Sequence, residues 1–253
     1  MENRFILTLF CALTSILIQA QDFEGLNDKR GVNVFERRRT NIFLRYTSVG
    51  GKYTTAVGGI TANFSYRIER SGKGEFSYNL ENPIIGDLIW SILNGGVNNA
   101  NEQAFSGGIM GWHKFHWNLV ATKRLLIAPG FSFGDYIYGS ERVGSAPNVL
   151  EPNGYYITAG PSLKANYVAT KSLWLDCVVG VDFSFAKLNS SGARYQSIDG
   201  YPKPAFAQIA VNVYHTSRFC GGIRLAQAID RGSNNDSATR LDISCGYLFG
   251  NRD

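Results

Sequence analysis

Cysteine, histidine and proline are scarce in this chain of 253 residues, which has 4 Cys, 3 His and 7 Pro. Cys11 lies in the apolar N-terminal segment, so an odd number of cysteines remains, on separate predicted strands, and we expect no disulfide framework. His113 and His116 are three residues apart, which puts their rings on opposite faces of a strand and gives no metal-ligand pair. We therefore expect neither a metal nor a cofactor.

Long hydrophobic runs are missing after the N-terminus. Residues 5–18 form an apolar run that follows Arg4 and precedes Ala20, and it is too short for a typical membrane helix. Residues 1–20 therefore read as a signal peptide, followed by a periplasmic segment at 21–39 and a barrel domain at 40–253. No later segment suits a membrane helix, so a closed barrel is the remaining way to span lipid.

The most informative stretch is 155–186, which reads as a membrane-spanning β-hairpin around a tight turn at Thr170–Lys171. Apolar and polar residues alternate on both sides of that turn, and a period of two puts each set on one face of a strand. Each arm is about as long as a tilted strand needs to be to cross a bilayer, roughly 9–11 residues. Aromatic residues at both ends of the apolar set match the two interfacial girdles of outer-membrane barrels.

The same alternation recurs along the chain and predicts a closed antiparallel transmembrane β-barrel of about ten strands, or eight if the short third segment is a loop. The ten segments are 41–47, 56–68, 75–80, 109–119, 125–133, 155–167, 173–185, 205–213, 219–225 and 241–249. Tight turns at 122–123, 170–171 and 216–217 alternate with longer connections at 139–154, 187–203 and 229–238. Because such barrels have short periplasmic turns, we expect both termini to lie in the periplasm.

One connection has helical spacing. Asn82 suits an N-cap, Pro83 suits the first helical position, and Gly95–Gly96 would end the helix. The helix either packs over the barrel mouth or rim, or serves as a docking site for a partner, because its apolar stripe has no obvious core to cover. The docking residues would be Ile85, Leu88, Ile89 and Ile92.

The last strand, 240–249, resembles the C-terminal assembly signal of outer-membrane barrel proteins, through its apolar alternation and its ending in Tyr247 and Phe249. Ser244 takes the usual glycine position, and four residues follow the final aromatic. With the Ala20–Gln21 junction, the chain looks most like small outer-membrane barrels of Bacteroidota, a group that includes the PorT-type barrels of type IX secretion. The resemblance implies a bacterial outer-membrane location, with lipid, lipopolysaccharide and the barrel assembly machinery as partners.

Charged residues fall on the inward faces of the predicted strands. They are Arg45, Arg67, Glu75, Lys114, Lys164, Asp176, Asp182, Arg224 and Asp242. A barrel of about ten strands has a narrow interior filled by side chains, in which buried charges must pair or stay hydrated. The set predicts an ion-pair network that plugs the lumen, with a polar path for small solutes as the alternative.

Enzymatic activity is not expected. No Ser, His and acid converge at the outer rim in this topology, and a nucleophile needs its base within hydrogen-bond reach. The basic residues are scattered over alternating faces, so nucleic-acid binding is not expected either. The leading hypothesis is a non-enzymatic subunit or scaffold of an envelope assembly, in secretion or surface-protein handling, with a protein partner. A narrow pore is the second hypothesis and a small-barrel enzyme the third.

Overall fold

The computed structural model describes residues 38–51, 57–70, 72–82, 105–138, 140–142, 150–152, 155–188, 195–196, 204–229 and 237–250. The predicted signal peptide and the predicted helix over 83–94 lie outside these residues. No helix in the described part of the chain is long and apolar enough to cross a membrane.

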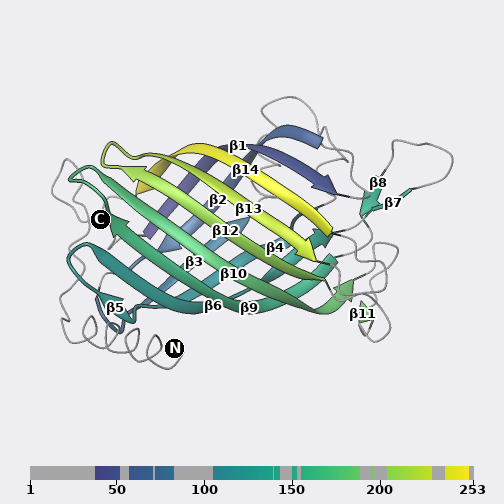
Figure 1. Cartoon of the computed structure of the whole chain (residues 1–253), viewed down its shortest axis with the longest axis horizontal. Coiled ribbons are helices and arrows are strands. Elements are labelled where there is room, and N and C mark those ends of the chain that lie inside the picture. Colours follow the sequence, from purple (N-terminus) through teal and green to yellow (C-terminus); the bar gives the residue numbers. More distant parts are fainter. Residues whose placement is uncertain are drawn as a thin grey trace, which may run out of the picture.

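Within the described segments, ten strands pair in a closed antiparallel ring. In ring order they are β1 (Arg38–Gly51), β2 (Val57–Ile68), β3 (Phe76–Asn82), β4 (Phe105–Trp117), β6 (Leu125–Tyr138), β9 (Tyr155–Val168), β10 (Leu173–Leu188), β12 (Ala205–His215), β13 (Phe219–Ile229) and β14 (Ser237–Gly250). Pairing of β1 with β14 closes the ring. Figure 1 shows the strands tilted across the long axis of the barrel.

Four shorter strands complete the description. β5 (Val120–Ala121) extends the wall beside β6, and β11 (Tyr195–Gln196) pairs with the end of β10. β7 (Ser140–Arg142) and β8 (Leu150–Pro152) form a separate two-stranded ribbon.

The predicted barrel of about ten strands is confirmed, because each of the ten alternating segments overlaps one strand of the ring. The short third segment is a true strand, β3, which pairs with β2 and β4 and therefore excludes the eight-stranded alternative. β1 begins and β14 ends beside each other, at the end of the barrel that carries the short turns at 118–124, 169–172 and 216–218. We call this end the short-turn end and the opposite one the long-loop end.

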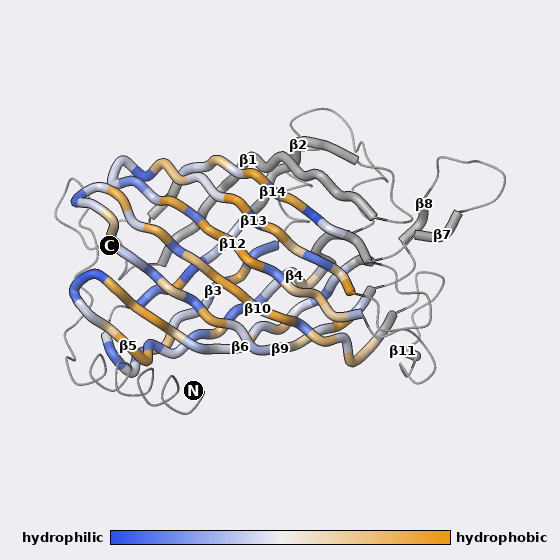
Figure 2. Tube along the Cα trace, in the orientation of Figure 1, coloured by the Kyte–Doolittle hydropathy of each residue, from blue (hydrophilic) through white to orange (hydrophobic). Residues whose placement is uncertain are grey.

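The outer surface of the barrel is apolar, and the alternation along each strand explains why. Large apolar side chains on the outward positions are exposed; on β12 and β13 they are Ile209, Val211, Val213, Phe219, Ile223, Leu225 and Ile229. The residues between them face inward and are largely buried. Figure 2 shows apolar residues (orange) recurring along strands such as β10, β12, β13 and β14. An apolar exterior around a polar interior is the distribution of membrane-spanning barrels.

Aromatic rings gather on the outer surface near the short-turn end. Phe76, Trp117 and Phe219 are all about half exposed or more. The two residues that resemble the assembly signal belong to this group: the Tyr247 ring lies 5.5 Å from that of Phe219 and 5.1 Å from that of Phe249. Such a belt suits the boundary between hydrocarbon and headgroups, where amphipathic rings concentrate.

The position of the apolar band predicts a depth-dependent cost for charge. Ile223, 57% exposed, lies in the middle of β13, whereas Gln227 lies outward and closer to the long-loop end. We expect Ile223→Arg to lower the free energy of unfolding in lipid vesicles by about 2–4 kcal/mol, and Gln227→Arg by about 0–1 kcal/mol. Urea titration of the refolded variants measures both, and equal costs at the two positions would contradict the placement of the band.

Candidate functional site: the charged layer of the lumen

The lumen contains two clusters of buried apolar residues with charged side chains between them. The short-turn cluster consists of Ala121, Leu126, Ala128, Val168, Trp174, Tyr214 and Cys220. The long-loop cluster consists of Trp112, Tyr136, Tyr156, Phe206, Ala226 and Ala228. We call the residues between them the charged layer: Arg67, Glu69, Glu81, Lys114, Lys164, Asp176, Asp182, Arg224, Arg240 and Asp242.

The first ion pair of the charged layer crosses the lumen from one wall to the other. Arg67 Nη1 on β2 donates to Asp176 Oδ2 on β10 at 2.7 Å. The two strands are diametrically opposed, since β3, β4, β6 and β9 separate them on one side and β1, β14, β13 and β12 on the other. The guanidinium also lies over the Tyr214 ring, 5.4 Å from its centroid, so it contacts the short-turn cluster.

A second arginine also bridges the lumen, beside the long-loop cluster. Arg224 on β13 donates from Nη2 to both carboxylate oxygens of Glu81 on β3. Its guanidinium lies 4.9 Å from the centre of the Trp112 ring, in the long-loop cluster. Each arginine is therefore held by a carboxylate from across the barrel and by an aromatic ring of one apolar cluster, an arrangement that suits a weakly hydrated planar cation.

The remaining contacts of the layer join more strands. Lys164 Nζ on β9 donates to Glu69 Oε2 at 2.6 Å and to Ser77 Oγ on β3 at 2.7 Å. On β14, Arg240 Nε donates to Asp242 Oδ1 at 2.8 Å. Together with the two arginine bridges, these bonds tie β2, β3, β9, β10 and β13 to one another through the centre of the barrel.

Asp182 accepts hydrogen bonds from two hydroxyl groups. Ser132 Oγ on β6 donates to Oδ1, and Tyr136 OH on the same strand donates to Oδ2 at 2.9 Å. Gln208 Nε2 on β12 in turn donates to the tyrosine oxygen at 3.4 Å. Asp182 thus joins β6 to β10 on the lumen side of the wall and contacts Tyr136 of the long-loop cluster.

A buried Ser and His pair is the arrangement in the lumen that most resembles a catalytic one. Ser162 Oγ lies 3.1 Å from His116 Nε2, and both side chains are buried. Within the described residues, no carboxylate hydrogen-bonds the other ring nitrogen, so the third group that orients a catalytic base is not provided there. The same part of the chain holds no group of three or more His, Cys, Asp or Glu placed to bind a metal ion.

Seven of the nine residues predicted for the lumen lie in the charged layer. The Arg45 side chain is outside the described residues. Glu75 does not join the others: it is exposed in the turn before β3, where its carboxylate accepts from the Gly72 backbone N–H at 2.8 Å. The strand begins one residue later, at Phe76, so the inward register does not reach Glu75.

Three charged residues of the layer were not predicted from the sequence, and each lies just past the end of a predicted segment. Glu69 follows Arg67 by two positions, Glu81 follows Asn79 by two, and Arg240 precedes Asp242 by two. Extending the alternation by one period on each of these strands would have found them.

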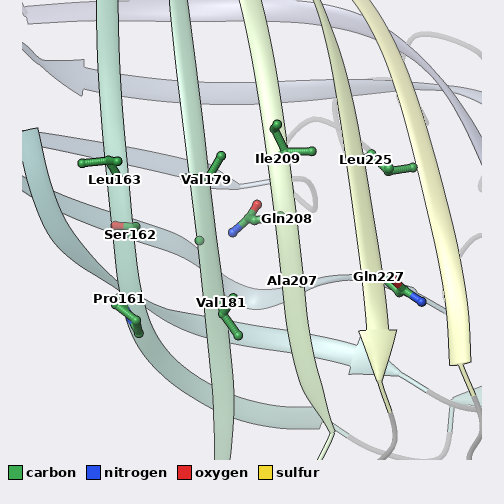
Figure 3. A pocket seen from close by; sticks show the side chains of 11 residues that line it. Pro161, Ser162, Leu163, Val179, Val181, Ala207, Gln208, Ile209, Leu225 and Gln227 are labelled. Carbon is green, nitrogen blue, oxygen red and sulfur yellow. The ribbon is translucent and has the colours of Figure 1, made fainter. Parts of the chain in front are cut away.

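A groove of about 510 Å³ lies on the wall where β9, β10, β12 and β13 run side by side. Its outward lining is apolar and includes Leu163, Val179, Ile209 and Leu225, which Figure 3 shows on four neighbouring strands. The small side chain of Ala207 leaves space between these larger residues, and Gln227 marks the side of the groove nearer the long-loop end.

No family model matches the chain, and no curated protein matches its sequence. Solved structures with a similar fold include Ail, the attachment invasion locus protein of Yersinia pestis, at 7% identity and a TM-score of 0.33, covering 85% of this chain and 99% of that one. The outer membrane protease OmpT from Escherichia coli is 9% identical with a TM-score of 0.36, covering 86% and 98%. The NanC porin is 9% identical with a TM-score of 0.35, covering 81% and 98%. At values this low, the fold assignment rests on the strand pairing of the chain itself.

Proposed function

We propose that this chain is an integral outer-membrane barrel with a lumen plugged by side chains, acting as a non-enzymatic subunit or scaffold of an envelope assembly, in secretion or surface-protein handling. The observation that carries the proposal is the pair of arginine bridges across the lumen, held between two apolar clusters. A barrel filled in this way leaves its outer wall and its long-loop end as the surfaces on which a function can be performed.

The energetics of the plug favour a static interior over a solute path. A path along the axis would have to separate Arg67 from Asp176 or Arg224 from Glu81, and both pairs are largely buried. Removing one partner of a buried pair costs about 3–5 kcal/mol, because the other charge is left without compensation. The aromatic rings of both clusters would also have to move, including the stacked pair Tyr136 and Phe206, whose centroids are 4.1 Å apart.

The location and orientation belong to the same proposal. Short turns on one end of the barrel and longer connections on the other support a periplasmic short-turn end, with both termini there. The outward aromatic ending at Tyr247 and Phe249 supports recognition by the barrel assembly machinery, and the apolar wall supports contact with outer-membrane lipid and lipopolysaccharide. The Ala20–Gln21 junction supports a barrel of the Bacteroidota type, and a role beside type IX secretion is the narrowest form of the proposal.

Co-purification tests the scaffold role directly. The full chain, carrying an affinity tag at its C-terminus, should retain a stoichiometric protein partner when it is purified from native membranes in mild detergent. A variant lacking residues 83–94 should fold equally well and lose that partner, if the apolar stripe of Ile85, Leu88, Ile89 and Ile92 is the docking surface. Recovery of the full chain alone, in several detergents, would contradict the scaffold role.

Conductance in planar bilayers tests the plug. We expect the purified full chain to give no current steps above the background of protein-free membranes, because the bridges and both clusters occupy the cross-section. Reproducible steps with a fixed amplitude would overturn the plugged lumen and favour a narrow pore.

A further inference from the structure

Lys114 carries a charge with no contact partner in the part of the chain that the structure describes. Its side chain is only 2% exposed and points into the lumen from β4, yet no ion pair or hydrogen bond engages its ammonium group there. The other cations of the charged layer each contact a carboxylate. A buried charge without a partner is costly, so Lys114 calls for a compensating group.

The nearest carboxylates are already engaged by other donors. Lys114 interacts electrostatically with Glu81 and Asp182, and also with the cations Arg67 and Arg224. Both oxygens of Glu81 accept from Arg224, and those of Asp182 accept from Ser132 and Tyr136. Arg67 contacts Asp176 and Arg224 contacts Glu81, so Lys114 is the one of these three cations with no carboxylate in direct contact among the described residues.

Further donors without acceptors lie beside Lys114. Trp112 lies two residues away on the same inward face of β4 and is 4% exposed, and its indole Nε1 has no hydrogen-bond partner among the described residues. Arg224, whose guanidinium lies over that indole ring, has no partner for Nε or Nη1 in the same part of the chain. These groups can only donate, so any group that satisfies them must be an acceptor.

We propose that Lys114, Arg224 and Trp112 hold a small monovalent anion, such as chloride, inside the lumen. Donors of this kind, together with an ammonium group that contacts no described carboxylate, match an anion better than a water molecule, which carries no charge. Across the charged layer as a whole, described cations and carboxylates are equal in number, which suits a small ion over a polyanion. The site goes beyond the proposed scaffold role and does not depend on it.

Anomalous diffraction tests the site directly. Crystals of the full chain, grown in detergent with bromide in place of chloride, should show an anomalous peak within hydrogen-bond reach of Lys114 Nζ. Crystals of Lys114→Met should lack the peak, and this variant should still fold, because the substitution removes the uncompensated charge and keeps most of the side-chain volume. A water molecule alone at this place in the wild-type protein would overturn the proposal, as would a bromide peak that persists in Lys114→Met.

Thermal unfolding in detergent gives a second measurement. At equal ionic strength, sodium chloride should raise the unfolding midpoint of the full chain above its value in sodium gluconate, whose anion is much larger than chloride. Lys114→Met should lose this shift, whereas Lys171→Met, the same substitution in an exposed turn, should keep it. Trp112→Phe keeps an aromatic ring and loses one donor, so it should raise the half-saturating chloride concentration about tenfold, as expected for one hydrogen bond to a charged group. A shift that is the same in wild type and Lys114→Met would contradict the site.

Discussion

Gly160→Ala is expected to prevent most of the chain from forming the barrel. Gly160 lies on β9 where the backbone of β10 comes close, and a Cβ atom there would overlap the carbonyl oxygen of Val181. Because the obstacle is backbone, it cannot turn aside as a flexible side chain would, and the strands would have to separate. We expect a cost of about 3 kcal/mol, the upper end of the range for overpacked sites. The folded fraction, seen as the heat-modifiable band in gel electrophoresis after refolding into vesicles, measures the effect.

Gly180→Ala is the matched control for that experiment. Gly180 lies on the neighbouring strand β10 and also faces the lumen, but its added Cβ would meet Ser162 Cβ at 3.3 Å, which a shift of a few tenths of an ångström relieves. We expect this variant to fold nearly as well as the wild type. Similar folded fractions for both alanine variants would show that the close approach of β9 and β10 does not limit assembly.

Asp176→Leu is expected to produce the second large effect, by leaving Arg67 without its carboxylate. The pair joins two opposed walls of the barrel, and the aspartate side chain is 2% exposed. Breaking a buried pair from one side costs about 3–5 kcal/mol. Urea unfolding in lipid vesicles, followed by tryptophan fluorescence, measures the loss in the free energy of unfolding.

The double variant Arg67→Met with Asp176→Leu separates the ion pair from the packing around it. Replacing both charges with apolar side chains of similar size leaves no lone charge, so much of the lost stability should return. The cycle of two single variants and the double variant then gives the coupling energy of the pair. Additive losses in the double variant would mean that the two residues act independently, which would contradict the bridge.

The number of strands and the inward or outward position of their side chains were predictable because the alternation of side chains is local. In β9 and β10 the period of two runs on both sides of a tight turn until the register shift after Ser184, so residues such as Lys164 and Asp176 could be assigned to the inward face from the sequence. The turn at Thr170–Lys171 also lies where it was expected, where Thr170 Oγ1 accepts from the backbone N–H of Ser172 and Leu173.

Strand ends and interior partners were harder to predict, for different physical reasons. The predicted strands stopped short of Glu81 and Arg240, because the end of a strand is set by backbone pairing with neighbours and not by the alternation. Partners across the lumen depend on the shear and curvature of the whole ring. Nothing in the local sequence of β13 indicates that Arg224 meets Glu81, 143 residues earlier in the chain.

The long separations of these partners bear on the order in which the protein matures. Arg67 and Asp176 are 109 residues apart, Lys164 and Glu69 are 95 apart, and Arg224 and Glu81 are 143 apart. Each pair joins strands that are not neighbours in the ring, so none can form in a hairpin or in a short open sheet. Strands that entered hydrocarbon one by one would carry these charges with no counterion, at a cost that grows with every strand added. We therefore expect neutralisation of the interior to come late in assembly, when the sheet curls enough for the β1–β14 seam to close.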